Sequence, residues 1–262
     1  MEYLCEYPLT ERLIVDTHAH YDDDRFENRE ELFDALSRSG VLGAVTCGCD
    51  GASSEAAAAL AERIDYLYFS AGVHPGNLES NTPLSEIKRL ARHPKCVAIG
   101  EIGLDYYWVS DNKAEQIERF EEQILLALRL DLPVIVHDRE AHADTLALLK
   151  KHRPKGVVHS FSGSPEMARE LLAIGMYIGV GGVITFKNAR RLPEVVAMLP
   201  DDRILLETDA PYLAPEPFRG KTNHSGMIFL SAQKIAALRG TSTEAVLRGT
   251  ARNARELFKV DW

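Results

Sequence analysis

Two histidines separated by a single residue follow an apolar run near the start of the chain. The run reads LIVDTHAH over residues 13–20, and its histidines are His18 and His20. Side chains two residues apart on a strand point to the same face, which is the arrangement that two ligands of one metal ion need. An isolated H-x-H motif also occurs by chance, as a pair of polar residues at a strand end. The remainder of the chain has to decide between these interpretations.

Further ionisable side chains stand at the ends of other apolar runs. They are His74 in GVHP, Glu101 in GEIGLD, His137 in IVHDR, His159 in VVHSF and Asp209 in LLETD. Each alone has an ordinary structural interpretation, such as a helix cap or a hydrogen-bonded core histidine. Buried together they are costly unless they are paired, protonated or bound to a cation. Four histidines with one glutamate and one aspartate supply enough ligands for two divalent ions, and Glu101 is able to bridge them.

The runs that carry these residues alternate regularly with amphipathic segments. We predict strands over residues 13–18, 42–48, 67–73, 96–102, 133–138, 156–161, 176–182 and 203–209. Helical patterns fall between them, and the longest has an apolar stripe formed by Ile117, Phe120, Ile124, Leu125 and Leu128. Short strands that are apolar on both faces suit a parallel sheet covered by helices.

Eight such units predict an α/β fold, a (β/α)8 TIM barrel with residues 1–262 as a single domain. A doubly wound open sheet is the main alternative. In barrels the active site lies at the C-terminal ends of the strands, where the ionisable side chains of this chain fall.

Composition limits the classes of function. The chain has 262 residues, of which 45% are hydrophobic and 26% charged, as in soluble proteins. No apolar stretch approaches the roughly 20 residues of a membrane span, and the N-terminus lacks an export signal, so we expect a cytoplasmic protein without membrane association. The net charge of −9 argues against gripping duplex nucleic acid by charge alone. Bound cations can nevertheless handle phosphate locally. We interpret Cys47 and Cys49 as reduced core residues.

In order along the chain, several motifs resemble those of the TatD family of metal-dependent deoxyribonucleases, within the wider group of amidohydrolase-type barrels. They are DTHAHYD, GVHP, GEIGLDYY, PVIVHDRE, HSFSG and ETDAPYLAPEPFRGKTN, and they cover nearly the whole length. The resemblance implies a first metal ion held by His18, His20, Glu101 and Asp209, and a second held by Glu101, His137 and His159. It also implies that His74 contacts the substrate phosphate. The chain departs from the family at Tyr21 and in the loop RGKTNHS, which we assign to the substrate rim.

The resemblance and the ligand set imply a hydrolase of phosphodiester bonds, a 3′→5′ exodeoxyribonuclease acting on single strands. Its cofactors would be two divalent ions (Mg, Mn, Zn or Ni), and we expect a monomer. Asp209 would accept a proton from water. His74, with Arg219 and Lys221 in the long loop, would stabilise charge on the phosphoryl oxygens. Arg139 would hold the carboxylate of Asp105 beside the metals.

Two alternatives remain open. One is a C–N or ester hydrolase, such as a dihydroorotase-like enzyme or an aminoacyl-tRNA deacylase. Many amidohydrolase relatives bridge their metals with a carbamylated lysine, whereas this chain has Glu101 at the fourth strand and no lysine at a predicted strand end. The other is a binding module without activity, which loss of a ligand would indicate, yet every ligand position is filled. We assign the remaining histidines to solvated or capping positions: His93, His142, His152 and His224.

Overall fold

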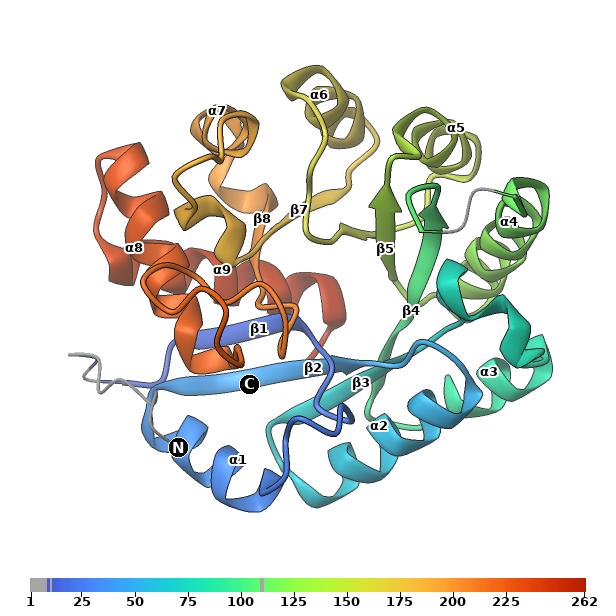
Figure 1. Ribbon diagram of the computed structural model, residues 1–262, viewed down its shortest axis with the longest axis horizontal. Helices are drawn as coiled ribbons and strands as arrows, with labels where there is room; N and C mark the ends of the chain where they lie inside the picture. The colour runs from blue at the N-terminus through green and yellow to red at the C-terminus, as the bar shows by residue number, and fades with distance from the viewer. Residues whose placement is uncertain (1–8, 10, 109–110) are drawn as a thin grey trace.

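The computed structural model describes residue 9, residues 11–108 and residues 111–262. Most of the N-terminal segment that we examined for an export signal lies outside these residues. The sheet has eight parallel strands whose spatial order is their chain order (Figure 1). They are β1 (Ile14–Ala19), β2 (Val41–Cys47), β3 (Leu67–Ala71), β4 (Cys96–Asp105), β5 (Val134–Arg139), β6 (Gly156–Val158), β7 (Tyr177–Val180) and β8 (Ile204–Leu206). A doubly wound sheet would reverse its strand order, so that alternative is wrong.

Helices follow the strands and surround the sheet (Figure 1). They are α1 (Arg29–Arg38), α2 (Gly51–Arg63), α3 (Leu84–Leu90), α4 (Lys113–Leu130), α5 (His142–His152), α6 (Pro165–Ala173), α7 (Arg191–Met198), α8 (Ile228–Arg239) and α9 (Thr243–Phe258). Short 3-10 turns are η1 (Pro75–Ser80), η2 (Gly182–Thr185), η3 (Asp201–Arg203) and η4 (Ser225–Met227). Within the described ranges, no helix combines the length and the apolar character needed to cross a membrane.

Hydrogen bonds join the last strand to the first. The hydroxyl of Thr17 donates to the carbonyl of Leu206 at 3.1 Å. Just beyond the strands, the N–H of Asp209 donates to the carbonyl of His18 at 2.9 Å. An isolated parallel bridge between Ala19 and Ala210 continues this contact. The sheet therefore curves back on itself, and the predicted (β/α)8 barrel is confirmed.

Helix α9 covers the N-terminal end of the barrel. Its buried side chains, among them Ala254 and Phe258, belong to one apolar cluster with side chains from seven of the strands, and Tyr68 of β3 packs against that cluster. The amide of Asn253 donates to the carbonyl of Ile204, the first residue of β8, at 2.9 Å and to that of Asp201 in η3 at 2.8 Å. Because α9 closes this end, the opposite end is left for a site.

Strands β6 and β8 end earlier than predicted. The apolar runs extend to residues 161 and 209, but the strands stop at Val158 and Leu206. Ser160 and Asp209 adopt left-handed backbone conformations, with φ of 43° and 58°, which a continuing strand does not allow. The chain turns at these points, so His159 and Asp209 lie just past their strands.

Strand β4 is longer than predicted and passes through the site. It runs to Asp105, so Glu101 lies inside the strand and not at its end. Its pairing with β5 shifts register between Ile99 and Ile102. The N–H of Glu101 instead donates to the carbonyl of Gly48 at 2.8 Å. This irregularity accompanies the inward position of the carboxylate.

Helix α4 is rotated relative to its predicted apolar stripe. Leu125 and Leu128 are 38% and 44% exposed, whereas Gln116 and Gln123 are buried. The amide of Gln123 accepts a hydrogen bond from the N–H of Val73 at 2.8 Å and donates to its carbonyl at 3.0 Å. An unsatisfied buried backbone group costs about 1–3 kcal/mol, which favours this orientation. The stripe was therefore partly wrong, because buried polar partners outweigh periodicity here.

We predict that Gly103→Ala destabilises the junction of β4 and β5. Gly103 has φ of +146°, and an added Cβ would lie 1.9 Å from the carbonyl oxygen of His137. Backbone strain and overpacking together should lower the free energy of unfolding by about 2–5 kcal/mol, measured by urea denaturation. The matched control is Gly249→Ala in α9, where an added Cβ meets nothing within 4 Å. That change should stabilise by about 0.5–1 kcal/mol. Equal denaturation midpoints for Gly103→Ala and the parent would contradict the prediction.

Candidate metal centre

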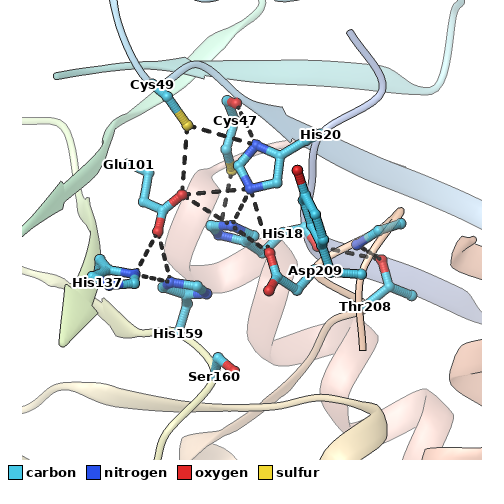
Figure 2. Close-up of polar contacts among 12 residues, drawn as sticks. His18, His20, Cys47, Cys49, Glu101, His137, His159, Ser160, Thr208 and Asp209 are labelled. Carbon is cyan, nitrogen blue, oxygen red and sulfur yellow. Dashed lines mark hydrogen bonds and ion pairs between the residues drawn. The ribbon is translucent and has the colours of Figure 1, made fainter. Parts of the chain in front are cut away.

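The six side chains predicted as metal ligands converge at the C-terminal end of the barrel (Figure 2). β1 and the residue after it carry the pair from the H-x-H motif, and β4 and β5 carry one ligand each. The other two follow β6 and β8. In chain order they are His18, His20, Glu101, His137, His159 and Asp209. Residues far apart in the sequence thus meet at one point because the strands of a barrel share one end.

One group of four donor atoms, the first donor group, has the spacing of a coordination shell. The Nε2 atoms of His18 and His20 lie 3.1 Å apart. Glu101 Oε2 lies 3.4 and 3.5 Å from them, and Asp209 Oδ1 lies 3.6 and 3.4 Å from them. A tetrahedral ion with bonds of about 2.1 Å separates its ligand atoms by about 3.4 Å. Each carboxylate therefore has, with His18 and His20, the spacing of ligands to one divalent ion.

The second donor group uses the other oxygen of the same carboxylate. Glu101 Oε1 lies 2.9 Å from His137 Nδ1 and 2.8 Å from His159 Nε2. The two nitrogens are 3.2 Å apart. Three protein donors are what catalytic zinc sites commonly supply, with a further position for water or substrate. Glu101 thus presents one oxygen to each group, as a bridging carboxylate does.

The cluster keeps its carboxylates ionised. Burial raises the pKa of Glu101, but the charge of His159 and a hydrogen bond with His137 outweigh it and hold that pKa well below its usual value. Burial likewise lowers the pKa of His137, yet hydrogen bonds to Asp105 and Glu101 raise it to about 9. Protons on imidazoles therefore balance the carboxylates when no cation is bound. A metal ion would replace those protons.

Asp105 orients one of the candidate ligands. Its Oδ2 lies 3.1 Å from His137 Nε2, so that nitrogen donates and Nδ1 faces Glu101. The amide of Gln116 holds the backbone of Asp105, accepting from its N–H at 2.8 Å and donating to its carbonyl at 3.1 Å. A carboxylate behind a ligating histidine fixes the ring and raises its basicity. The sequence prediction had placed Asp105 near the metals but missed this partner.

Asp16 joins β1 to the residues that follow β8. Its carboxylate accepts hydrogen bonds from the hydroxyl of Thr208 at 2.6 Å and that of Ser225 at 2.7 Å. Burial raises its pKa to about 6, although these bonds lower it. Tyr21 is fully buried, with its hydroxyl 2.5 Å from Ser225 Oγ. Our assignment of Tyr21 to the substrate rim was wrong, because the ring supports this network from behind.

Glu207 lies behind His159. One of its oxygens accepts a short hydrogen bond from the N–H of Ser160 and is 3.8 Å from His159 Nδ1. Burial raises the pKa of Glu207 to about 8, despite the nearby charge of His159. Its other oxygen and His159 Nδ1 have no hydrogen-bond partner among the described residues. A small movement would let His159 Nδ1 donate to Glu207, which leaves Nε2 for the second donor group.

Two thiols line the cluster. Cys47 Sγ lies 3.5 Å from His18 Nδ1. Cys49 Sγ lies 3.8 Å from both His20 Nδ1 and Glu101 Oε2, so it is not simply a core residue (Figure 2). The sequence signal was the C-x-C spacing at a strand end, which places both side chains on one face, as H-x-H does.

Of the three residues predicted to contact the substrate, His74 lies beside the donor groups, whereas Arg219 and Lys221 lie in the loop after β8. His74 Nδ1 accepts from the N–H of Gly76 at 3.0 Å, and its Nε2 lies 3.5 Å from Glu101 Oε1. Arg219 and Lys221 are exposed in the loop after β8. The guanidinium of Arg219 packs over Phe186, 4.4 Å from the ring centroid. Contact of these two cations with substrate stays a prediction.

Two other assignments need correction. His224 directly precedes η4, but its side chain is 7% exposed and therefore not solvated. Arg139 makes no ion pair with Asp105 in the described part of the chain and instead lies 4.3 Å from the ring centroid of Tyr107. The three remaining histidines pair with carboxylates away from the donor groups: His93 with Glu62, His142 with Asp138 and His152 with Glu121.

Comparisons with known proteins agree with this geometry. Residues 15–259 match the sequence profile of the family described as TatD related DNase. The chain is 38% identical to YabD of Bacillus subtilis, an uncharacterized metal-dependent hydrolase, over 95% of this chain and 100% of that protein. It is 35% identical to the 3′-5′ ssDNA/RNA exonuclease TatD of Erwinia tasmaniensis, over 89% and 95% of the two chains. The crystal structure of YjjV, a TatD homologue of Escherichia coli, superposes with a TM-score of 0.89 and 35% identity, covering 95% and 99%.

We predict that Asp105→Asn weakens metal binding at the second donor group. The amide cannot accept from His137 Nε2 as strongly, so affinity there should fall about 10–100-fold, as for other residues behind metal ligands. Metal content after dialysis against graded chelator concentrations measures this change. The control is Asp138→Asn, since Asp138 pairs with His142 on α5 at 2.7 Å. Equal metal retention by both variants would show that Asp105 does not support a metal ligand.

Proposed function

Because the chain belongs to the family of TatD related DNases and is a metal-dependent hydrolase, we propose that it hydrolyses phosphodiester bonds of single-stranded nucleic acid, removing nucleotides from the 3′ end. The observation that carries this proposal is Glu101, which offers one oxygen to each of two adjacent donor groups. Paired metal sites that share a ligand are common in phosphatases and nucleases. The name of the Erwinia tasmaniensis relative supports the substrate and the direction.

The metal ligands are proposed as two sets joined by the bridging carboxylate. The first donor group would hold one ion, and the second donor group would hold the other. When bound, two divalent ions would polarise the phosphoryl oxygens and lower the pKa of a coordinated water. Imidazole and carboxylate donors accept Mg, Mn, Zn or Ni, and availability selects among them.

Asp209 is proposed as the general base. Its side chain is 20% exposed, compared with 4% for Glu101, so it is the carboxylate of the cluster that reaches solvent. Burial raises the pKa of Asp209, but its hydrogen bond with His20 and the charge of His18 lower it below its usual value. An ionised carboxylate with access to solvent can accept a proton from the attacking water and release it.

His74 is proposed as the donor to the phosphate. Burial lowers its pKa to about 4, although the charge of Glu101 opposes this shift, so the ring is neutral at pH 7. Because Nδ1 accepts from Gly76, the proton of the neutral ring is on Nε2, which faces the second donor group. A neutral N–H donor in this place would stabilise charge that develops on a phosphoryl oxygen.

Product analysis on labelled DNA tests the proposed activity. With divalent metal present, a 5′-labelled single strand should shorten one nucleotide at a time, while a circular single strand of the same sequence stays intact. Chelation should abolish the activity. Glu101→Gln is the inactive control, since it keeps the size of the side chain and removes the bridging charge.

Internal cuts in the circle at the rate of the linear strand would contradict exonuclease action. Hydrolysis of a model carboxylic ester or amide without any cleavage of DNA or RNA would instead favour the C–N or ester hydrolase alternative.

We predict that His74→Ala loses about a hundredfold in rate, as for removal of one transition-state donor. Metal content and thermal stability should match the parent, because both donor groups are complete without His74. The matched control is Asn77→Ala in the same turn, whose amide bonds Asp50 Oδ2 at 3.0 Å outside the cluster. Loss of metal would make His74 a ligand, and an unchanged rate would make it structural.

A further inference from the structure

The turn after β4 carries the two most exposed large apolar side chains of the described residues. Tyr107 is 57% exposed and Trp108 is 71% exposed. Their ring centroids are 4.8 Å apart, with the planes nearly perpendicular. Arg139, at the end of β5, places its guanidinium carbon 4.3 Å from the Tyr107 centroid and 5.3 Å from that of Trp108. We call these three residues the aromatic cluster.

Hydrogen bonds to Asp105 hold the aromatic cluster at a fixed place beside the second donor group. Asp105 Oδ1 accepts from the backbone N–H of Tyr107 at 3.0 Å and of Trp108 at 2.9 Å. The other oxygen of the same carboxylate faces His137 Nε2. The backbones of Asp105 and Arg139 also lie opposite each other in the register of β4 and β5. One carboxylate therefore sets both the ring of a candidate ligand and the turn that presents the aromatic side chains.

Stabilisation of the turn alone does not account for the exposure of these rings. A surface contact between an arginine and an aromatic ring contributes about 0.5–1 kcal/mol of stability. Such a contact uses one face of the ring and does not require the other face to be exposed to water. Exposed aromatic faces beside an arginine are the surfaces on which unpaired nucleobases stack. The chain also has a net charge of −9, so general attraction of a polyanion is weak. Stacking contributes about 1–3 kcal/mol per base without demanding a basic surface.

On the basis of the nuclease function proposed above, we propose that Tyr107, Trp108 and Arg139 form a stacking subsite for one unpaired base of the substrate. The base lies against the exposed face of Trp108 while a neighbouring phosphate reaches the donor groups. A base paired within a duplex presents no free face, so the subsite selects single strands. Arg139 holds the rings and supplies a positive charge beside the strand.

Tryptophan fluorescence tests the subsite without relying on turnover. The chain has two tryptophans, and Trp262 packs against Tyr68 at 5.6 Å near the N-terminal end of the barrel. In a Trp262→Phe background, with metal present, oligothymidylate with phosphorothioate linkages at its 3′ end should quench Trp108 on binding. In the otherwise unaltered protein, Trp108→Ala should bind this probe about 10–100-fold more weakly, and Trp108→Phe should retain most of the affinity.

The controls separate stacking from loss of structure. A probe that lacks the bases of its 3′-terminal nucleotides should bind the parent and Trp108→Ala equally. Leu128→Ala removes another exposed apolar side chain, 44% exposed on α4, and should leave binding unchanged. Equal affinity of parent and Trp108→Ala for the normal probe would overturn the subsite while the nuclease function stands. Failure of the parent to bind or cleave any single strand would overturn both.

Discussion

The site depends on one buried carboxylate. Glu101 is 4% exposed and has five imidazole nitrogens within 3.5 Å, and taking such a charge out of water costs several kcal/mol unless partners or cations surround it. The register shift in β4 coincides with the point where this side chain lies inside the barrel. Removing either the carboxylate or its cationic partners would leave the other buried and uncompensated.

Three further buried carboxylates connect the donor groups to the surrounding strands and turns. Asp105 supports His137 and the turn after β4, while Asp16 joins β1 to the residues that follow β8. Glu207 occupies the corresponding place behind His159. Each of these acids links two neighbouring segments of the barrel, so the shape of the site and the closure of the sheet are maintained by the same hydrogen bonds.

The proposed substrate is an acidic polymer, and the chain is itself acidic. Its net charge of −9 gives little general attraction for nucleic acid, so in the proposed function positive charge would come from cations in the donor groups. The aromatic cluster would add affinity through stacking, which does not depend on net charge. Such a site suits the end of a single strand, because a duplex would need a broad basic surface that composition does not favour.

Strand periodicity was sufficient to predict the barrel, and strand-end chemistry marked the ionisable side chains that converge in it, since both are local patterns repeated along the chain. The division of six of these side chains into two ligand sets came from the family resemblance. Other features depend on contacts between distant residues and have no local signal. Tyr21 is buried with its hydroxyl hydrogen-bonded to Ser225, and Gln123 is buried with its amide hydrogen-bonded to the backbone of Val73. Likewise, only the closed barrel shows α9 covering one end, Cys49 beside Glu101, and the Asp105 carboxylate bonded to His137 with no ion pair to Arg139 among the described residues. Sequence determines which residues can be ligands, whereas the tertiary structure decides which atoms orient them, because hydrogen-bond partners are chosen by proximity in space.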